Sequence, residues 1–209
     1  MRRVTVDPLA PDHALVAAAA AVIKAGGVVA YPTDTLYGLA VDPRNDAAVE
    51  RLFELKGRAA SASILLIAAD VTMAERAAAE RFGPLEHRLA ASFWPGPLTI
   101  VVPASTEMSA ALAPRGTLGV RVPAHLVAQS LSAAFGDCIT ATSANLAGRP
   151  ASVTADEVAA ALGAVIDFLL DAGPAPGGAP STVVEVVEGR PLLHRASAVA
   201  WDRVLESVE

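Results

Sequence analysis

Short apolar runs recur along the chain, and each has the length of a β-strand rather than that of a membrane-spanning helix. They occupy residues 28–31, 64–68, 98–102, 118–122 and 138–141. A strand covered on both faces needs no polar alternation, so such runs are typical of strands buried inside a sheet. Further strands are expected at 4–6, 168–171, 181–187 and 192–195. No run approaches the roughly 18 apolar residues that a membrane helix needs, so we expect no membrane partner.

Helical segments separate these strands, and several of them begin with capping residues. The predicted helices span 12–25, 45–55, 74–91, 126–135, 154–162 and 199–208. Asp12 and Asn45 are expected as N-caps, and residues 154–157 form a capping-box pattern. Gly83-Pro84 is expected to divide the third helix into two pieces. Because strands and helices mix without a strict strand-helix-strand rhythm, the sequence predicts an α/β protein, close to α+β, with a mixed sheet.

A single domain spanning residues 1–209 is expected, because one hydrophobic core can still grow over this length. Hydrophobic residues make up 53% of the chain and aromatic residues only 4%, so aliphatic side chains must fill that core. The one cysteine, Cys138, excludes an intramolecular disulfide and suits a reducing cytoplasm, which is the predicted location. A net charge of −6 argues against a protein held on nucleic acid by its overall charge.

Several well-known catalytic motifs are missing from the sequence. It contains no GxxxxGK[ST] phosphate-binding loop, no GxGxxG after a strand, no GxSxG and no HExxH. The four histidines stand singly, and a lone histidine is more often structural than catalytic. An enzyme that acts on phosphates would therefore have to draw its cationic groups from separate loops.

Polar clusters follow several of the predicted strands and helices, where α/β proteins place ligand-binding groups. The stretch PTDTLYGL at 32–39 follows a buried strand and holds more hydroxyls than a turn requires. Lys56 and Arg58 flank a glycine after the second helix. They could bind phosphate oxygens, or they could merely complement the negative end of the helix.

Two further clusters also contain polar groups that could bind an anion. Arg121 interrupts an apolar strand, which is costly unless it meets an anion, although a half-exposed strand would also explain it. Hydroxyls and an amide follow the strand at 138–141, and Ser181 and Arg195 lie near later strand ends. Hydroxyls of this kind bind phosphate but also form ordinary turns. Taken together, the clusters predict one site for an anionic ligand.

In order, the segments PTDTLYGL, KGR at 56–58, WPGPLT at 94–99, RVPAH at 121–125, TSAN at 142–145 and STVV at 181–184 resemble the YrdC/Sua5 family of L-threonylcarbamoyladenylate synthases. The resemblance runs from about residue 26 to 195 and is closer to the short YrdC type than to the longer Sua5 type. It implies a YrdC/RibB-type twisted mixed sheet, with helices around a large concave cavity. It also implies a reaction, in which L-threonine, bicarbonate or CO2 and ATP give threonylcarbamoyl-AMP and pyrophosphate. A partner transferase then moves the threonylcarbamoyl group to adenosine 37 of tRNA.

The resemblance also assigns roles to residues of this chain. It places Lys56, Arg58, Ser143 and Asn145 in the catalytic signature, and it gives ATP these four residues together with Thr117 and Arg195. It gives threonine the residues Thr33, Thr35, Arg121 and Ser181. Mg²⁺ is expected to be held mainly by the ATP phosphates, with no protein ligand assigned. Since the two substrates react with one another, no protein nucleophile is needed, and positioning and charge neutralisation must supply the catalysis.

Two departures from the family pattern leave other functions open. The family's proline and lysine after KxR are replaced here by alanines and serines at 59–63, and its Arg-x-Gly near the end is Arg195-Ala196-Ser197. A divergent paralogue acting on another carbamoyl-adenylate remains an alternative, as does a module that binds double-stranded or transfer RNA. Binding through phosphate contacts would weaken steeply with salt. The role of His125, structural or bicarbonate-polarising, also stays open.

Overall fold

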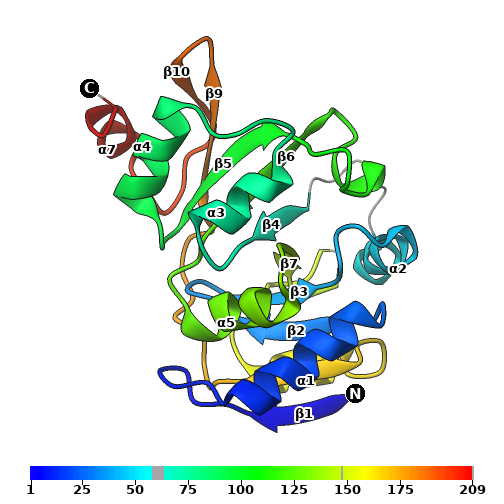
Figure 1. The fold of residues 1–209 in the computed structure, drawn as a ribbon. Coiled ribbons are helices and arrows are strands. Elements are labelled where there is room, and N and C mark those ends of the chain that lie inside the picture. The colour runs from blue at the N-terminus through cyan, green and yellow to red at the C-terminus, as the bar shows by residue number, and fades with distance from the viewer. Residues whose placement is uncertain (58–63, 147, 209) are drawn as a thin grey trace.

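The computed structural model describes residues 1–57, 64–146 and 148–208, and a ten-stranded mixed sheet runs through this part of the chain (Figure 1). Its spatial order is β1-β8-β2-β3-β7-β4-β6-β5-β9-β10. The strands are β1 (Arg2–Thr5), β2 (Val29–Pro32), β3 (Tyr37–Ala40), β4 (Leu65–Ile67), β5 (Leu98–Pro103), β6 (Thr117–Arg121), β7 (Ile139–Ser143), β8 (Phe168–Asp171), β9 (Thr182–Val187) and β10 (Arg190–Arg195). Four neighbouring pairs are parallel (β1/β8, β8/β2, β4/β6, β5/β9) and the others antiparallel, which confirms the predicted mixed sheet.

Strand β7 joins the two halves of this sheet. Near its end it pairs with β3, where Ser143 is opposite Gly38, and earlier it pairs with β4, where Ala141 is opposite Leu65. Ser143 is therefore placed where the two halves meet.

The helices are α1 (His13–Lys24), α2 (Asp46–Lys56), α3 (Val71–Ala74), α4 (Pro84–Phe93), α5 (Leu126–Phe135), α6 (Ala155–Leu162) and α7 (Trp201–Glu206), with 3₁₀ turns η1 (Glu75–Ala77) and η2 (Ala110–Leu112). The predicted caps are confirmed. Asp12 accepts hydrogen bonds from the first turn of α1, Asn45 does so for α2, and Thr154 forms the capping box of α6.

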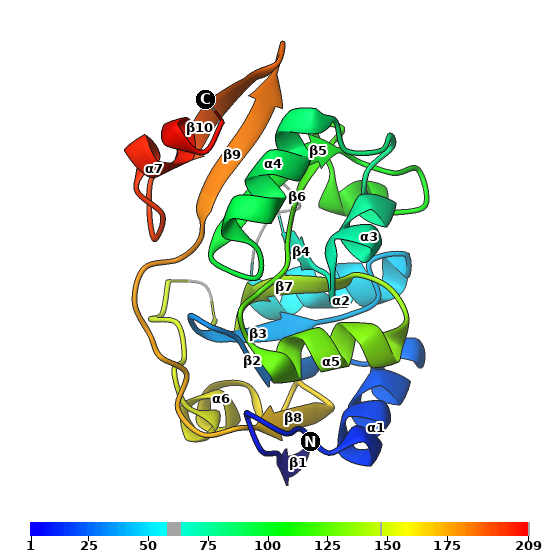
Figure 2. The ribbon, with the colours of Figure 1, turned by 60° about the vertical axis from the view of Figure 1, so that its left-hand side comes forward.

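Two hydrophobic cores lie on opposite faces of the central strands. Helices α1 and α5 lie side by side and contribute to the first core, to which β2 adds Val29 and Tyr31 (Figures 1 and 2). Ala30 belongs to the second core with α2, α4 and α6. Successive side chains of a strand point to opposite faces. The prediction that this strand is buried on both faces is therefore confirmed.

The predicted helix at 74–91 is partly wrong. Helical structure ends at Ala77, and Ala78 forms a bridge with Ala104 while the Ala79 N–H bonds to Pro103. Helix α4 then begins at Pro84, so Gly83-Pro84 starts a helix rather than interrupting one, in keeping with the preference of proline for the first turn. Alanine has the highest intrinsic helix propensity, but the free energy involved is small, and pairing with a distant segment outweighs it here.

Strand β3 was not predicted, and it explains much of PTDTLYGL. Strands β2 and β3 form an antiparallel hairpin, with residues 33–36 as its loop. Gly38 pairs with Tyr31 across the hairpin, and a Cβ at this position would lie only 3.2 Å from the tyrosine ring. The glycine thus lets the ring pack directly against the neighbouring strand.

The proline- and glycine-rich segment at 172–180 crosses from β8 to β9 without forming a helix or strand. Hydrogen bonds attach it to the rest of the protein: Tyr37 Oη donates to the Gly173 carbonyl at 2.7 Å, and the Gly177 N–H donates to the Thr35 carbonyl at 2.9 Å. In the part of the chain that the structure describes, no helix is both long and apolar enough to cross a membrane.

Candidate functional site

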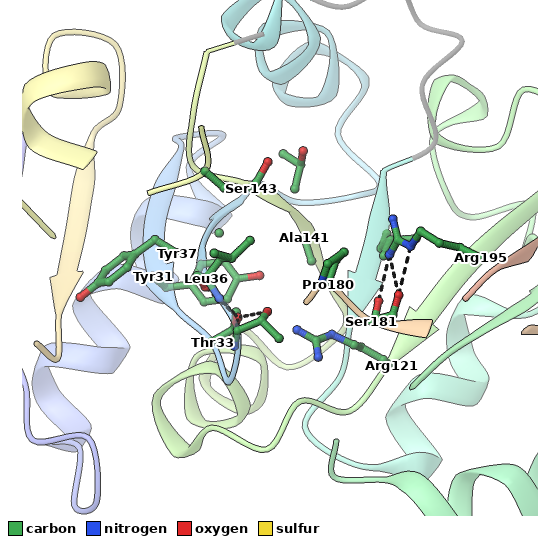
Figure 3. A pocket seen from close by; sticks show the side chains of 15 residues that line it. Tyr31, Thr33, Leu36, Tyr37, Arg121, Ala141, Ser143, Pro180, Ser181 and Arg195 are labelled. Carbon is green, nitrogen blue, oxygen red and sulfur yellow. Dashed lines mark hydrogen bonds between the residues drawn. The ribbon is translucent and has the colours of Figure 1, made fainter. Parts of the chain in front are cut away.

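A cavity of about 250 Å³ lies beside the β2–β3 hairpin, where β6, β7 and the start of β9 also contribute residues (Figure 3). Its walls include Tyr31, Leu36, Tyr37, Gly38, Leu65, Ala141, Thr142, Ala151 and Pro180. Six residues that the sequence analysis selected also line it: Thr33, Thr35, Arg121, Ser143, Ser181 and Arg195. These six come from five separate parts of the sequence, and the fold brings them to one cavity.

The hairpin loop presents two threonines to this cavity. The Thr33 hydroxyl donates to the Leu36 carbonyl at 2.7 Å and accepts from the Thr35 and Leu36 N–H groups, each at 3.2 Å. It also lies 3.1 Å from the Thr35 hydroxyl. Thr33 therefore closes the loop as well as lining the cavity, so the hydroxyls of PTDTLYGL stabilise a turn and face a cavity at once.

Arg121, at the end of β6, forms a buried ion pair with Asp34 of the hairpin loop. Nη1 lies 3.0 Å from Oδ1 and 3.2 Å from Oδ2, and the arginine and aspartate side chains are 7% and 11% exposed. A buried arginine here was expected to pair with an anion, and the protein itself supplies one, the Asp34 carboxylate. Asp34 was not among the predicted site residues.

Arg195, at the end of β10, lies across the same cavity against Ser181. Its Nε and Nη2 donate to the Ser181 carbonyl at 3.1 and 2.8 Å, and the Ser181 hydroxyl lies 2.8 Å from that of Thr99. Burial lowers the pKa of Arg195, and the charge of Arg121 lowers it further. Two guanidinium groups therefore share one cavity, which favours an anionic ligand.

Lys56 ends helix α2 and is fully buried. Its Nζ donates to the carbonyls of Ser143 and Asn145 and to Asn145 Oδ1, each at 2.6 Å. The Ser143 hydroxyl donates to the same Oδ1 at 2.6 Å. The lysine thus connects helix α2 to the residues at the end of β7. These hydrogen bonds hold Ser143 in place at the cavity wall.

The remaining predicted site residues lie elsewhere. Thr117 begins β6, at the opposite end of the strand from Arg121, and it is not among the described residues that line the cavity. Neither Lys56 nor Asn145 lines it. Arg58 and the altered segment at 59–63 lie outside the described residues. The Ser197 N–H donates to the buried Thr182 hydroxyl at 3.1 Å, which attaches this departure from the family pattern to β9.

His125 lies at the start of α5 and is partly buried. Burial lowers its pKa, and the charge of Asp34 opposes this effect only in part, so the imidazole is neutral at pH 7. Its Nδ1 is buried without a hydrogen-bond partner among the described residues. On the cavity wall, burial raises the pKa of the Tyr37 phenol to about 12 and also raises that of Tyr31, so both act as neutral hydroxyls.

Among the described residues, no three or more His, Cys, Asp or Glu side chains are grouped so that they could hold a metal ion. The cavity instead offers guanidinium and hydroxyl donors, which match carboxylate or phosphate oxygens. Such a site fits a magnesium ion that is carried by the phosphates of a nucleotide.

The fold and the site together define an α/β protein with a cavity lined by guanidinium and hydroxyl groups. The family model described as "Telomere recombination", which covers Sua5, YciO and YrdC proteins, matches residues 21–197. A threonylcarbamoyl-AMP synthase from Nitrosococcus oceani is 39% identical over 173 residues, which are 82% of this chain and 91% of that protein. The chain belongs to the Sua5/YciO/YrdC family, and the resemblance found in its motifs is confirmed.

Longer relatives also match almost the entire chain. The crystal structure of Pyrococcus abyssi Sua5 complexed with L-threonine superposes with a TM-score of 0.92 and 32% identity, covering 99% of this chain and 61% of that one. A Bacillus subtilis threonylcarbamoyl-AMP synthase is 34% identical over 206 residues, 95% of this chain and 58% of that protein. The chain thus spans about three fifths of these two relatives.

Proposed function

We propose that the protein is an L-threonylcarbamoyladenylate synthase that converts L-threonine, bicarbonate or CO2, and ATP to threonylcarbamoyl-AMP and pyrophosphate. The observation that carries this proposal is the cavity in which Arg121 and Arg195 lie with the hydroxyls of Thr33, Thr35, Ser143 and Ser181. Relatives that bear this name, and the Sua5 structure with L-threonine, support it. Residues 1–209 would act as one YrdC-like domain.

In this proposal the amino acid occupies the side of the cavity nearest the hairpin. Arg121 binds the carboxylate of threonine, because a guanidinium offers the planar donor geometry that a carboxylate matches. Thr33 and Thr35 contribute hydroxyls from the hairpin, and Ser181, which lies against Arg195, contributes one from across the cavity. Each hydroxyl can donate to or accept from the polar groups of the amino acid.

The nucleotide occupies the side formed by β7 and β10. Ser143 and Arg195 line the cavity there, while Lys56 and Asn145 hold the β7 exit in place. Arg58 and Thr117 remain proposed nucleotide contacts from the family pattern. Mg²⁺ would arrive with ATP and neutralise charge on the phosphates.

The chemistry requires positioning more than covalent participation by the protein. The threonine amine and bicarbonate condense to a carbamate with loss of water, and a carbamate oxygen then attacks the α-phosphorus of ATP. The bond from the α-phosphorus to the bridging oxygen breaks, and pyrophosphate leaves. Fixed cations stabilise the charge that develops on the phosphate oxygens during this displacement.

The product would pass to a partner transferase that modifies adenosine 37 of tRNA in the cytoplasm. A transient tRNA contact is compatible with this role. The RNA-binding alternative predicts instead that binding, rather than turnover, is the main activity, and that it falls steeply between low and physiological salt.

The decisive experiment incubates the purified protein with Mg-ATP, bicarbonate and a panel of amino acids. Pyrophosphate release would be followed, and threonylcarbamoyl-AMP identified by mass spectrometry. Threonine-dependent formation of both products is the expected result. Pyrophosphate release that does not depend on threonine would exclude this function.

Replacing Thr33 by valine should lower threonine-dependent turnover strongly, by roughly tenfold or more, because the isosteric side chain leaves the Thr35 and Leu36 N–H groups without their acceptor. The Leu36 carbonyl would keep only the Thr33 N–H, at 3.0 Å, as its donor. Thr33→Ser retains the hydroxyl and serves as the matched control, with activity close to that of the wild type. Full activity in Thr33→Val would contradict this role of the threonine.

A further inference from the structure

Asp34 is a buried carboxylate that pairs with Arg121, one of the described arginines that line the cavity, and it has no role in the mechanism proposed above. Both of its oxygens approach the same nitrogen, Nη1 of Arg121, at 3.0 and 3.2 Å. The pair is therefore not the fork in which a carboxylate occupies two guanidinium nitrogens. Only one corner of the guanidinium is taken up by this contact.

The other two guanidinium nitrogens of Arg121, Nε and Nη2, do not contact Asp34. Within the described part of the chain, Nε and Nη2 of Arg121 form no hydrogen bond, and neither is a buried atom that lacks a partner. Arg121 lines the cavity, and its guanidinium points toward the hairpin loop that carries Thr33 (Figure 3). A planar guanidinium that is held at one nitrogen presents its other donors in a set direction. Nε and Nη2 are thus the donors left for a ligand.

We propose that Asp34 is a positioning residue, which holds Arg121 by Nη1 so that its free donors meet the carboxylate of the amino-acid substrate. This inference rests on the proposed function, because it takes an amino acid as the ligand. It also assigns the aspartate of PTDTLYGL a task distinct from those of the two threonines beside it.

The charges of the cavity residues also support a positioning role for Asp34. Burial lowers the pKa of Arg195, and the charge of Arg121 lowers it further, because the two guanidinium groups that line the cavity repel one another. Asp34 offsets the charge of Arg121 and so makes a fixed, buried position tolerable for that arginine, which would otherwise be expensive to keep in place.

The other polar groups around the pair do not replace Asp34. The Tyr31 hydroxyl donates to the Thr140 carbonyl at 3.2 Å, and His125 forms no hydrogen bond with Arg121 in the described structure. Among the described residues, Asp34 is the only hydrogen-bond partner of the Arg121 side chain. The orientation of the arginine therefore depends on this one carboxylate.

The test is the Asp34→Asn variant, assayed through pyrophosphate release with threonine and ATP varied separately. Asparagine keeps an oxygen near Nη1 but removes the charge. The KM for threonine should rise about tenfold or more, as expected for weakening one charge-assisted contact, while the KM for ATP stays within about twofold. A merely structural role would change both constants together.

Two further variants make the result independent of folding. Arg121→Lys keeps a charge opposite Asp34 but lacks the extra donors, so its KM for threonine should also rise, and adding Asp34→Asn to it should have little further effect. Asp137→Asn is the matched control, because Asp137 is 12% exposed and pairs with Arg44 at 2.9 Å away from the cavity lining. It should leave the KM for threonine unchanged.

The outcomes separate the inference from the proposed function. An unchanged or lower KM for threonine in Asp34→Asn would overturn the inference, as would a normal KM in Arg121→Lys or fully additive effects in the double variant. Equal rises for threonine and ATP would also overturn it. If the wild type shows no threonine-dependent activity at all, the proposed function fails, and this inference fails with it.

Discussion

Replacing Lys56 by methionine is expected to cost about 3–5 kcal/mol of stability and to abolish most of the synthase activity. Methionine has a similar length but no donor, so the carbonyls of Ser143 and Asn145 and the Asn145 side-chain oxygen lose a partner that lies 2.6 Å from each. The β7 exit would then no longer hold Ser143 at the cavity. Urea denaturation measures the first effect, and pyrophosphate release measures the second.

Lys24→Met provides a matched control for this experiment. Lys24 also ends a helix, α1, and donates to one backbone carbonyl, that of Ala134, at 3.2 Å, but it is exposed. Its loss should change stability by less than about 0.5 kcal/mol, as is usual for surface substitutions. If both variants lost the same stability, the burial of Lys56 would not explain its effect.

Replacing Arg121 by methionine should be comparably severe for a different reason. The change leaves the Asp34 carboxylate buried without its cation, which is expected to cost about 3–5 kcal/mol. It also removes the proposed carboxylate contact, so kcat/KM for threonine should fall roughly a hundredfold or more. Thermal denaturation and pyrophosphate release would measure the two effects on the same preparation.

The Asp34→Ala/Arg121→Met double variant separates stability from function. Removing both members of a buried ion pair is often nearly neutral for folding. Most of the lost stability should therefore return, while threonine-dependent activity should stay low. Recovery of activity together with stability would show that Arg121 serves the fold alone and does not bind threonine.

Much of the fold was predictable because its signals are local. The apolar run before PTDTLYGL predicted a doubly buried strand, and Asp12, Asn45 and Thr154 marked the starts of three helices at which they do form caps. Strand β3 was not predicted, because the hydroxyl-rich loop before it was interpreted only as a ligand-binding segment. The apolar residues that follow that loop would have indicated a hairpin.

The candidate site was predictable in part. The resemblance to the family predicted six residues that the fold does bring to one cavity: Thr33, Thr35, Arg121, Ser143, Ser181 and Arg195. Asp34 was missed, although it lies inside the quoted motif. Its importance depends on a contact with a strand 87 positions away, and nothing in the local sequence indicates that contact.

The sequence by itself determined the mixed α/β class, the caps, the doubly buried strands and membership of the family. These properties follow from backbone propensity, from burial patterns and from motifs whose order can be read along one chain. Only the tertiary structure decided that Lys56 donates hydrogen bonds to the β7 exit, 87 positions away. It also decided that Arg121, on the cavity wall, pairs with Asp34. The strand order of the sheet creates both contacts, and the partner of a buried charge is set by which distant segments the sheet places side by side.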